Sequence, residues 1–229
     1  MGLCIDPTEG FYPHEQYYKQ ASEFLGVSDN KIILFDPLNP KILDVWFKAF
    51  LHPLENYGID FFWNDYRGTS DPTNLWTTNH YLYLDSGRNS ARRSMILARN
   101  GIYAPHLYPV LYGGSSEVSW EALKKLPFQY LNAANIGVSW WSHDVGGNHG
   151  GIEESELYIR YLELSVYSPI LRFHGARGPY YKREPWLWDV KTENIAADYL
   201  RLRHRLIPYL YTEAYNYTKS GTPLIQPFY

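Results

Sequence analysis

The sequence has only one cysteine among its 229 residues, Cys4, and this excludes both an internal disulfide framework and a cysteine-based zinc site. It also has no run of about 18 apolar residues, the length that a transmembrane helix needs. The N-terminus lacks the basic and then apolar order of a signal peptide. These absences mildly favour a cytoplasmic location, although an export signal could precede the sequence if the chain is incomplete.

Charge of neither sign is in large excess, since the formal net charge is −3 and 20% of the residues are charged. This balance gives no electrostatic reason to expect a nucleic acid or an anionic membrane as a partner. Aromatic residues, by contrast, make up 17% of the chain, with 22 Tyr and 8 Trp. Two explanations are open: a large core filled with rings, or a carbohydrate site in which the C–H faces of sugars pack on aromatic faces.

Short apolar segments alternate with helical patterns along the whole chain. Helical spacing is present in residues 13–25, from Asn39-Pro40 to Leu51, after the N-cap Ser119, and in residues 153–167 and 195–217. The strand candidates are residues 2–6, 59–65, 92–99, 109–115, 136–144 and 170–174. Such alternation predicts a parallel sheet covered by helices.

Polar residues close these strand candidates: Asp6, Asp65, Arg99, Ser115, Asp144 and His174. A (β/α)8 barrel, or TIM barrel, gathers such residues around one mouth, where the chemistry takes place. Only six strands are visible, so we expect an incomplete α/β barrel whose two further strands precede Met1. A doubly wound sheet is the alternative, but the glycines at 113–114 and 146–147 are pairs and not the G-x-G-x-x-G fingerprint of a dinucleotide site.

The most informative stretch is residues 57–68. Its apolar run from Ile59 to Trp63 stops at Asn64-Asp65 and breaks into a turn, which is the pattern of a buried strand whose carboxyl end carries a carboxylate. Asp65 is therefore either a catalytic carboxylate or a residue that caps a helix or holds a turn.

Five motifs follow one another along the chain: Trp63-Asn-Asp65, Leu97-Ala-Arg99, Trp141-Ser-His-Asp-Val-Gly-Gly147, Leu171-Arg-Phe-His174 and Lys182-Arg-Glu-Pro-Trp186. In this order they resemble motifs of glycoside hydrolase family 31, the retaining α-glycosidases that include α-glucosidases and α-xylosidases. The resemblance covers essentially the whole chain. It implies that residues 1–229 are a partial (β/α)8 catalytic domain with about strands 3 to 8, and that the first barrel strands and an N-terminal β-sandwich are missing.

The resemblance also implies roles for single residues. Asp65 is expected to be the nucleophile, and Arg99 beside it would favour the ionised carboxylate. The residues expected to bind the sugar are Trp63, Arg99, Trp141, Asp144 and His174, with the Trp residues as packing faces. A retaining glycosidase needs a second carboxyl group about 5–5.5 Å from the nucleophile, which stays protonated until it gives its proton to the leaving oxygen.

The chain departs from the family pattern at this acid/base position. Ser115 stands where the family has an aspartate after a glycine, and Leu107 stands where many relatives have an arginine. A serine hydroxyl is too weak an acid to protonate a leaving sugar oxygen at a useful rate, and general acid catalysis is typically worth about 10²–10⁴-fold. Three explanations are open: a weak or inactive relative, Glu117 as a substitute acid, or a proton from the substrate or solvent.

The sequence therefore predicts a retaining α-glycosidase that hydrolyses α-linked glucosides or related sugars through a covalent glycosyl-aspartate intermediate. A catalytically weak carbohydrate-binding relative is the alternative, and a transglycosylase, which differs only in the acceptor, is a third. No cofactor and no metal are expected, because the spacing of His143, Asp144 and His149 matches no common ligand pattern. The expected partners are a carbohydrate substrate and the remainder of the catalytic domain.

Overall fold

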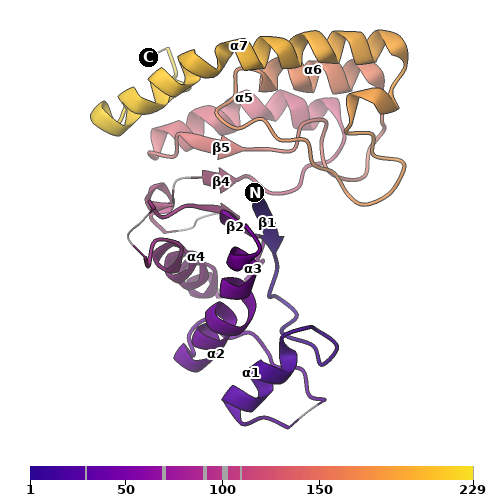
Figure 1. Cartoon of the computed structure of the whole chain (residues 1–229). Coiled ribbons are helices and arrows are strands. Elements are labelled where there is room, and N and C mark those ends of the chain that lie inside the picture. The colour runs from indigo at the N-terminus through magenta and orange to yellow at the C-terminus, as the bar shows by residue number, and fades with distance from the viewer. Residues whose placement is uncertain (29, 69–70, 90–91, 100–102, 109, 229) are drawn as a thin grey trace. The chain divides into compact units, whose positions relative to one another are not determined.

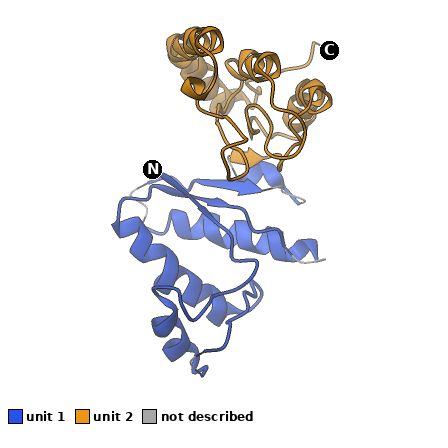
Figure 2. Cartoon of the chain, turned by 90° about the vertical axis from the view of Figure 1, so that its right-hand side faces the viewer, with its two compact units in different colours: residues 1–109 blue, residues 110–229 orange. Residues whose placement is uncertain are grey.

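The computed structural model describes residues 1–228, except for residues 29, 69–70, 90–91, 100–102 and 109. The chain forms two compact units, Met1–Pro109 and Val110–Tyr229, which Figure 2 shows in different colours. Each unit contains its own parallel strands and its own helices.

Unit 1 is built on the parallel strands β1 (Gly2–Ile5), β2 (Phe61–Asn64) and β3 (Ile96–Arg99), shown in Figure 1. In their register Leu3 lies opposite Phe62, and Trp63 lies opposite Leu97. The alternation of burial along β2, with Phe62 and Asn64 buried and their neighbours half-buried, is that of a strand with one face on the core. The predicted parallel pairing is confirmed here, although both β2 and β3 begin later than the sequence pattern suggested.

The helices of unit 1 are α1 (Tyr18–Leu25), α2 (Pro40–Val45), α3 (His52–Asn56) and α4 (Pro72–Ser86), and a π-helical turn, Trp46–Leu51, joins α2 to α3. Asn39 caps α2 as predicted, because its side chain accepts a hydrogen bond from the Lys41 amide at 3.0 Å. The prediction of a helix over residues 13–25 is wrong for its first part. Residues 13–17 form turns that are closed by backbone hydrogen bonds between residues three apart, such as the bond from the Tyr18 amide to the Glu15 carbonyl.

Unit 2 contains the parallel strands β4 (Val110–Tyr112) and β5 (Trp140–Ser142) with the helices α5 (Trp120–Asn135), α6 (Ser155–Ser165) and α7 (Val190–Ser220). Ser119 caps α5 through a bond from the Ala122 amide to its hydroxyl, as the sequence predicts. The core joins the three helices through side chains that include Leu126, Tyr161 and Ala196. Unit 2 thus has the strand-then-helix order of a parallel α/β fold.

The strand predicted over residues 170–174 is wrong in extent, since only Phe173 pairs, as a single parallel bridge with Val145. The reason lies in the neighbouring segment. β5 ends at Ser142, and the chain turns at Gly146 and Gly147, both with positive φ, so little backbone is left for pairing.

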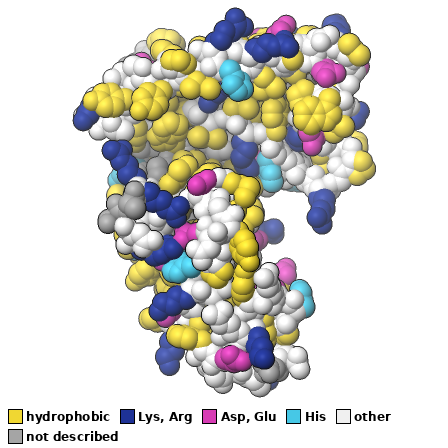
Figure 3. Space-filling view, in the orientation of Figure 1, with side chains coloured by type: hydrophobic (Ala, Val, Ile, Leu, Met, Phe, Trp, Pro, Cys, Tyr) yellow, Lys and Arg dark blue, Asp and Glu magenta, His cyan; other side chains and the backbone are white. Residues whose placement is uncertain are grey.

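The long helix α7 has the amphipathic character that the sequence predicts, but its outer side is not purely polar. Figure 3 shows hydrophobic side chains over much of the region that contains α7. The large exposed ones described on this helix are Val190, Ile207, Tyr209, Tyr211 and Tyr215. Among the described residues, no helix is both long enough and apolar enough to cross a membrane.

Candidate functional site

Asp65 directly follows β2, and its neighbours fix its direction. Asn64 is fully buried and its amide donates to the side-chain oxygen of Asn79 on α4 at 2.7 Å. Tyr66 is also buried, and its backbone amide donates to Asn64 at 3.3 Å. Because side chains alternate along an extended chain, these two anchors leave Asp65 on the opposite face, together with Trp63. Both of these side chains are half-buried.

Asp65 forms an ion pair with Arg99, the last residue of β3. The strand register explains this pairing, because Asn64 lies opposite Ala98 and the next residue of each strand is Asp65 or Arg99. The two side chains retain 19% and 21% exposure, so the pair is partly shielded from water yet reachable by a ligand. In unit 1 the structure therefore brings together the predicted nucleophile and one predicted sugar-binding residue at the carboxyl ends of two neighbouring strands.

In unit 2, Asp144 is the centre of a buried polar network. Its carboxylate accepts hydrogen bonds from the Tyr112 hydroxyl at 2.8 Å, from the Asn148 amide at 2.8 Å and from Arg172 at 2.6 Å. The Arg172 guanidinium also lies over the Tyr112 ring, 4.6 Å from its centre. Only 1% of Asp144 is exposed, so both carboxylate oxygens are engaged by protein groups. The role of Asp144 in binding sugar hydroxyls stays a prediction.

Ser115 is exposed and lies next to this network, with its hydroxyl 3.1 Å from that of Tyr112. Burial, followed by the Asp144 carboxylate, raises the pKa of Tyr112 well above its ordinary range. Because the single proton of Tyr112 goes to Asp144, the Ser115 hydroxyl acts as the donor toward Tyr112. Ser115, which stands at the predicted acid/base position, is thus the outer end of a chain of hydroxyl groups that runs through Tyr112 to Asp144.

The remaining predicted residues of unit 2 have different surroundings. Trp141 lies on β5 and packs against Gly113, where any side chain would collide with the indole ring. His174 is half-buried in the segment that follows the Phe173 bridge. Glu117 is exposed and belongs to a loop whose backbone is hydrogen-bonded to that of residues 148–149.

Arg183 is a residue whose role the sequence did not reveal. Its guanidinium is buried and donates to the Gly147 carbonyl at 3.1 Å and to the Glu153 carboxylate at 2.7 Å. Burial raises the pKa of Glu153, and the charge of Arg183 opposes this shift. These two hydrogen bonds fix the loop that follows Asp144. The motif at residues 182–186 was the sequence signal that could have identified Arg183.

The surroundings of His143 are those of a residue in the core. His143 is 4% exposed and is bonded to Tyr130 at 2.6 Å and to Ser165 at 2.9 Å, so its ring serves the packing of α5 and α6. Within the described part of the chain, no group of three or more His, Cys, Asp or Glu side chains has the geometry to hold a metal ion.

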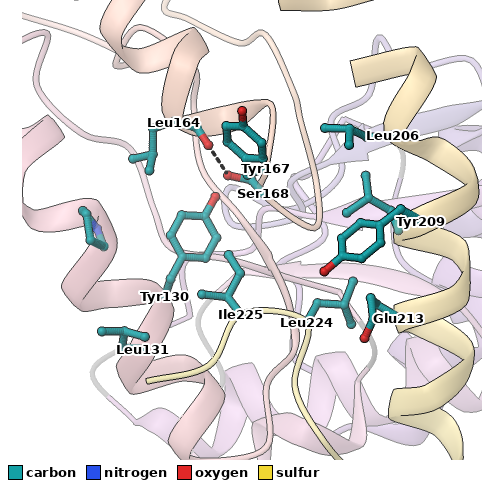
Figure 4. Close-up of a pocket in the computed structure, with 12 residues that line it drawn as sticks. Tyr130, Leu131, Leu164, Tyr167, Ser168, Leu206, Tyr209, Glu213, Leu224 and Ile225 are labelled. Carbon is teal, nitrogen blue, oxygen red and sulfur yellow. Dashed lines mark hydrogen bonds between the residues drawn. The ribbon is translucent and has the colours of Figure 1, made fainter. Parts of the chain in front are cut away.

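A pocket of about 370 Å³ lies in unit 2 among side chains of its three helices (Figure 4). It is lined by side chains from the second half of α5, the end of α6, the middle of α7 and residues 224–225, and Tyr130, Tyr209 and Glu213 are among them. Tyr130 is also the hydrogen-bond partner of His143, but none of the predicted catalytic or sugar-binding residues lines this pocket.

Comparison with known proteins gives consistent results. Residues 8–213 match the family model described as the glycosyl hydrolases family 31 TIM-barrel domain. Alpha-xylosidase from Emericella nidulans is 28% identical over 204 residues, which cover 80% of this chain and 25% of the relative. Alpha-glucosidase 2 from Bacillus thermoamyloliquefaciens is 30% identical over 143 residues, or 61% of this chain and 18% of the relative. The chain thus spans about a quarter or less of the length of these curated relatives.

Solved structures show the same fold. The cycloalternan-degrading enzyme from Trueperella pyogenes superposes with a TM-score of 0.80 at 19% identity, over 99% of this chain and 38% of that chain. A dextranase from Flavobacterium johnsoniae in complex with glucose gives a TM-score of 0.76 at 22% identity, over 96% of this chain and 32% of that chain. The parallel strands and helices of both units are therefore an incomplete TIM barrel.

Proposed function

Because this chain belongs to glycosyl hydrolase family 31, we propose that it is the part of a retaining α-glycosidase that supplies the nucleophile, Asp65, for cleavage of α-linked glucosides or related sugars. The observation that carries the proposal is the ion pair of Asp65 with Arg99 at the carboxyl ends of two adjacent parallel strands. This edge of the sheet is where enzymes of this fold carry their catalytic groups.

In the first step, Asp65 attacks the anomeric carbon of the sugar. Arg99 binds one carboxylate oxygen, which leaves the other oxygen to form the new bond to carbon. The bond from the anomeric carbon to the leaving oxygen breaks, and the product is a glycosyl ester of Asp65. Water then attacks the same carbon and releases the sugar and the Asp65 carboxylate.

Ser115 makes both steps slow on ordinary glycosides. The first step needs a proton for the leaving oxygen, and the second needs a base that accepts a proton from water. The Ser115 hydroxyl can do neither well, because it is a weak acid and is bonded to Tyr112. We therefore propose good reactivity only toward sugars whose leaving group departs without a proton, and accumulation of the glycosyl ester. A serine at position 115 also favours the second candidate function, that of a relative that binds carbohydrate without turnover.

The test uses 4-nitrophenyl α-glucoside and the full-length protein that contains these residues. We expect a burst of up to one equivalent of nitrophenol, followed by slow turnover, and no burst in Asp65→Ala. The matched control is Asp198→Ala, which removes an exposed carboxylate of α7 and should leave the burst intact. Ser115→Asp should raise hydrolysis of an unactivated disaccharide by about 10²–10⁴-fold.

Two results would contradict the proposal. An unchanged burst in Asp65→Ala would show that Asp65 is not the nucleophile. Glucose binding by the wild-type protein without any burst would exclude the hydrolase and favour the carbohydrate-binding relative.

A further inference from the structure

A groove of about 320 Å³ lies in unit 2 and is formed by its two strand-to-helix connections. One wall comes from residues 117–120, between the end of β4 at Tyr112 and the start of α5. The other wall comes from residues 151–154, between the end of β5 and the start of α6. Both walls therefore belong to the carboxyl-end edge of the strands, the edge that also carries Tyr112 and Asp144.

The two walls are fixed to each other by backbone hydrogen bonds. The Val118 amide donates to the His149 carbonyl at 3.0 Å, and the Ile152 amide donates to the Val118 carbonyl at 3.1 Å. Gly151 has a φ of +63° and passes so close to Val118 that a side chain would collide with its carbonyl oxygen. The groove is thus preformed, and a ligand would not need to order its walls on binding.

Trp120 is a flat apolar surface held in place at this groove. Its indole N–H donates to the Glu154 carboxylate, which fixes the ring, while 46% of the residue remains exposed. Ile152, across the groove, is 74% exposed. Exposed apolar side chains that stand singly are common, but two of them in one preformed groove form a surface that a ligand can cover.

The polar groups of the groove decide which ligand fits. Glu117 and Glu154 are both exposed carboxylates, so they accept hydrogen bonds and repel anions. A neutral sugar ring has the complementary chemistry, since its C–H face packs on an aromatic ring while its hydroxyl groups donate to carboxylates. Sulfated sugars and uronic acids do not meet this requirement.

We propose that this groove binds one neutral hexopyranose unit of an oligosaccharide, with the ring stacked on Trp120 and a hydroxyl group donating to Glu117. The choice of an α-linked gluco-oligosaccharide rests on the proposed function of the chain. The groove is an additional carbohydrate subsite that lies wholly within unit 2 and is distinct from the pair of Asp65 and Arg99.

The test is calorimetric titration of the full-length protein with Asp65→Asn, which prevents turnover, using glucose, maltotetraose and isomaltotetraose as probes. We expect at least one tetrasaccharide to bind more tightly than glucose. Trp120→Ala should weaken tetrasaccharide binding about tenfold, the effect of losing a well-packed aromatic anchor, and should leave glucose binding unchanged. Trp120→Phe keeps a flat ring and should retain most of the affinity, which separates loss of stacking from misfolding. The matched control is Phe128→Ala, which removes an exposed ring from the same helix outside the groove.

The outcomes separate this proposal from the proposed function. Tetrasaccharide binding that depends on Trp120, in a protein without a nitrophenol burst, supports the groove and excludes the glycosidase. A normal burst together with tetrasaccharide affinity that is equal in wild-type and Trp120→Ala proteins overturns the groove and leaves the glycosidase intact. A folded protein that binds neither tetrasaccharide more tightly than glucose also overturns the groove.

Discussion

His143 makes the stability of unit 2 sensitive to mild acid. Ser165 donates its only proton to the Tyr161 carbonyl at 2.6 Å, so it accepts from the ring nitrogen Nε2 of His143 at 2.9 Å. The other ring nitrogen, Nδ1, then accepts from the Tyr130 hydroxyl at 2.6 Å. The surroundings therefore select the neutral ring. Burial, followed by the charge of Arg172, lowers the pKa of His143 from 6.5 to about 3.

The sign and size of the effect follow from this difference. Between pH 7 and pH 5 the histidine of the unfolded chain takes up a proton, whereas His143 in the folded chain does not. The unfolded state is thus favoured as the pH falls. With an ordinary pKa of 6.5 for the unfolded chain, the contribution of His143 to the free energy of unfolding decreases by about 2 kcal/mol between pH 7 and pH 5. The loss continues toward pH 3, where the folded chain also becomes protonated.

The assay is urea unfolding of wild-type and His143→Gln proteins at pH 5, 6 and 7. The drop in unfolding free energy from pH 7 to pH 5 should be smaller in the variant by about 2 kcal/mol. The control His204→Gln removes an exposed histidine of α7 and should not reduce the drop in this way. Equal drops in wild type and His143→Gln would refute the reasoning. An imidazole NMR signal of His143 that titrates near pH 6.5 in the folded protein would refute it as well.

Two further predictions concern the ion pair of Glu153 with Arg183 and the close contact of Gly151 with Val118 in unit 2. Glu153→Leu leaves the buried guanidinium of Arg183 without its charged partner and should lower the free energy of unfolding by about 3–5 kcal/mol. The double variant Glu153→Leu/Arg183→Met removes both charges and should recover much of this loss in the same urea experiment. Gly151→Ala should lower the melting temperature more than Gly221→Ala does: both positions have positive φ, but a side chain at 151 also collides with Val118 and one at 221 meets open space. An equal effect of the two alanines would contradict the close-contact argument.

The proximity of Asp65 and Arg99 was expected from the family resemblance, and the strand pattern explains it. Each residue closes a short apolar strand, and neighbouring parallel strands place such ends side by side. The start of helix α5 could also be predicted from the sequence, because the capping hydrogen bond joins Ser119 to Ala122, only three residues away.

The features that the sequence did not reveal depend on contacts between distant segments. Arg183 finds its partners 30 and 36 residues away, at Glu153 and Gly147, and the motif at residues 182–186 does not indicate either of them. The bond from Tyr112 to Asp144 likewise spans 32 residues. The extent of the strand near Phe173 was overestimated, because pairing depends on how far its neighbour extends and not on its own composition.

The position of Ser115 has a consequence for what a replacement of this residue can affect. Tyr112 donates a hydrogen bond to Asp144, and its ring lies under the guanidinium of Arg172. Neither contact involves residue 115, which is exposed to solvent. A replacement there removes the hydrogen bond to Tyr112 and costs little folding free energy, as is usual for exposed side chains. A change of residue at this position should therefore leave the contacts among Tyr112, Asp144 and Arg172 in place, and its effect should fall on the proposed proton transfer alone.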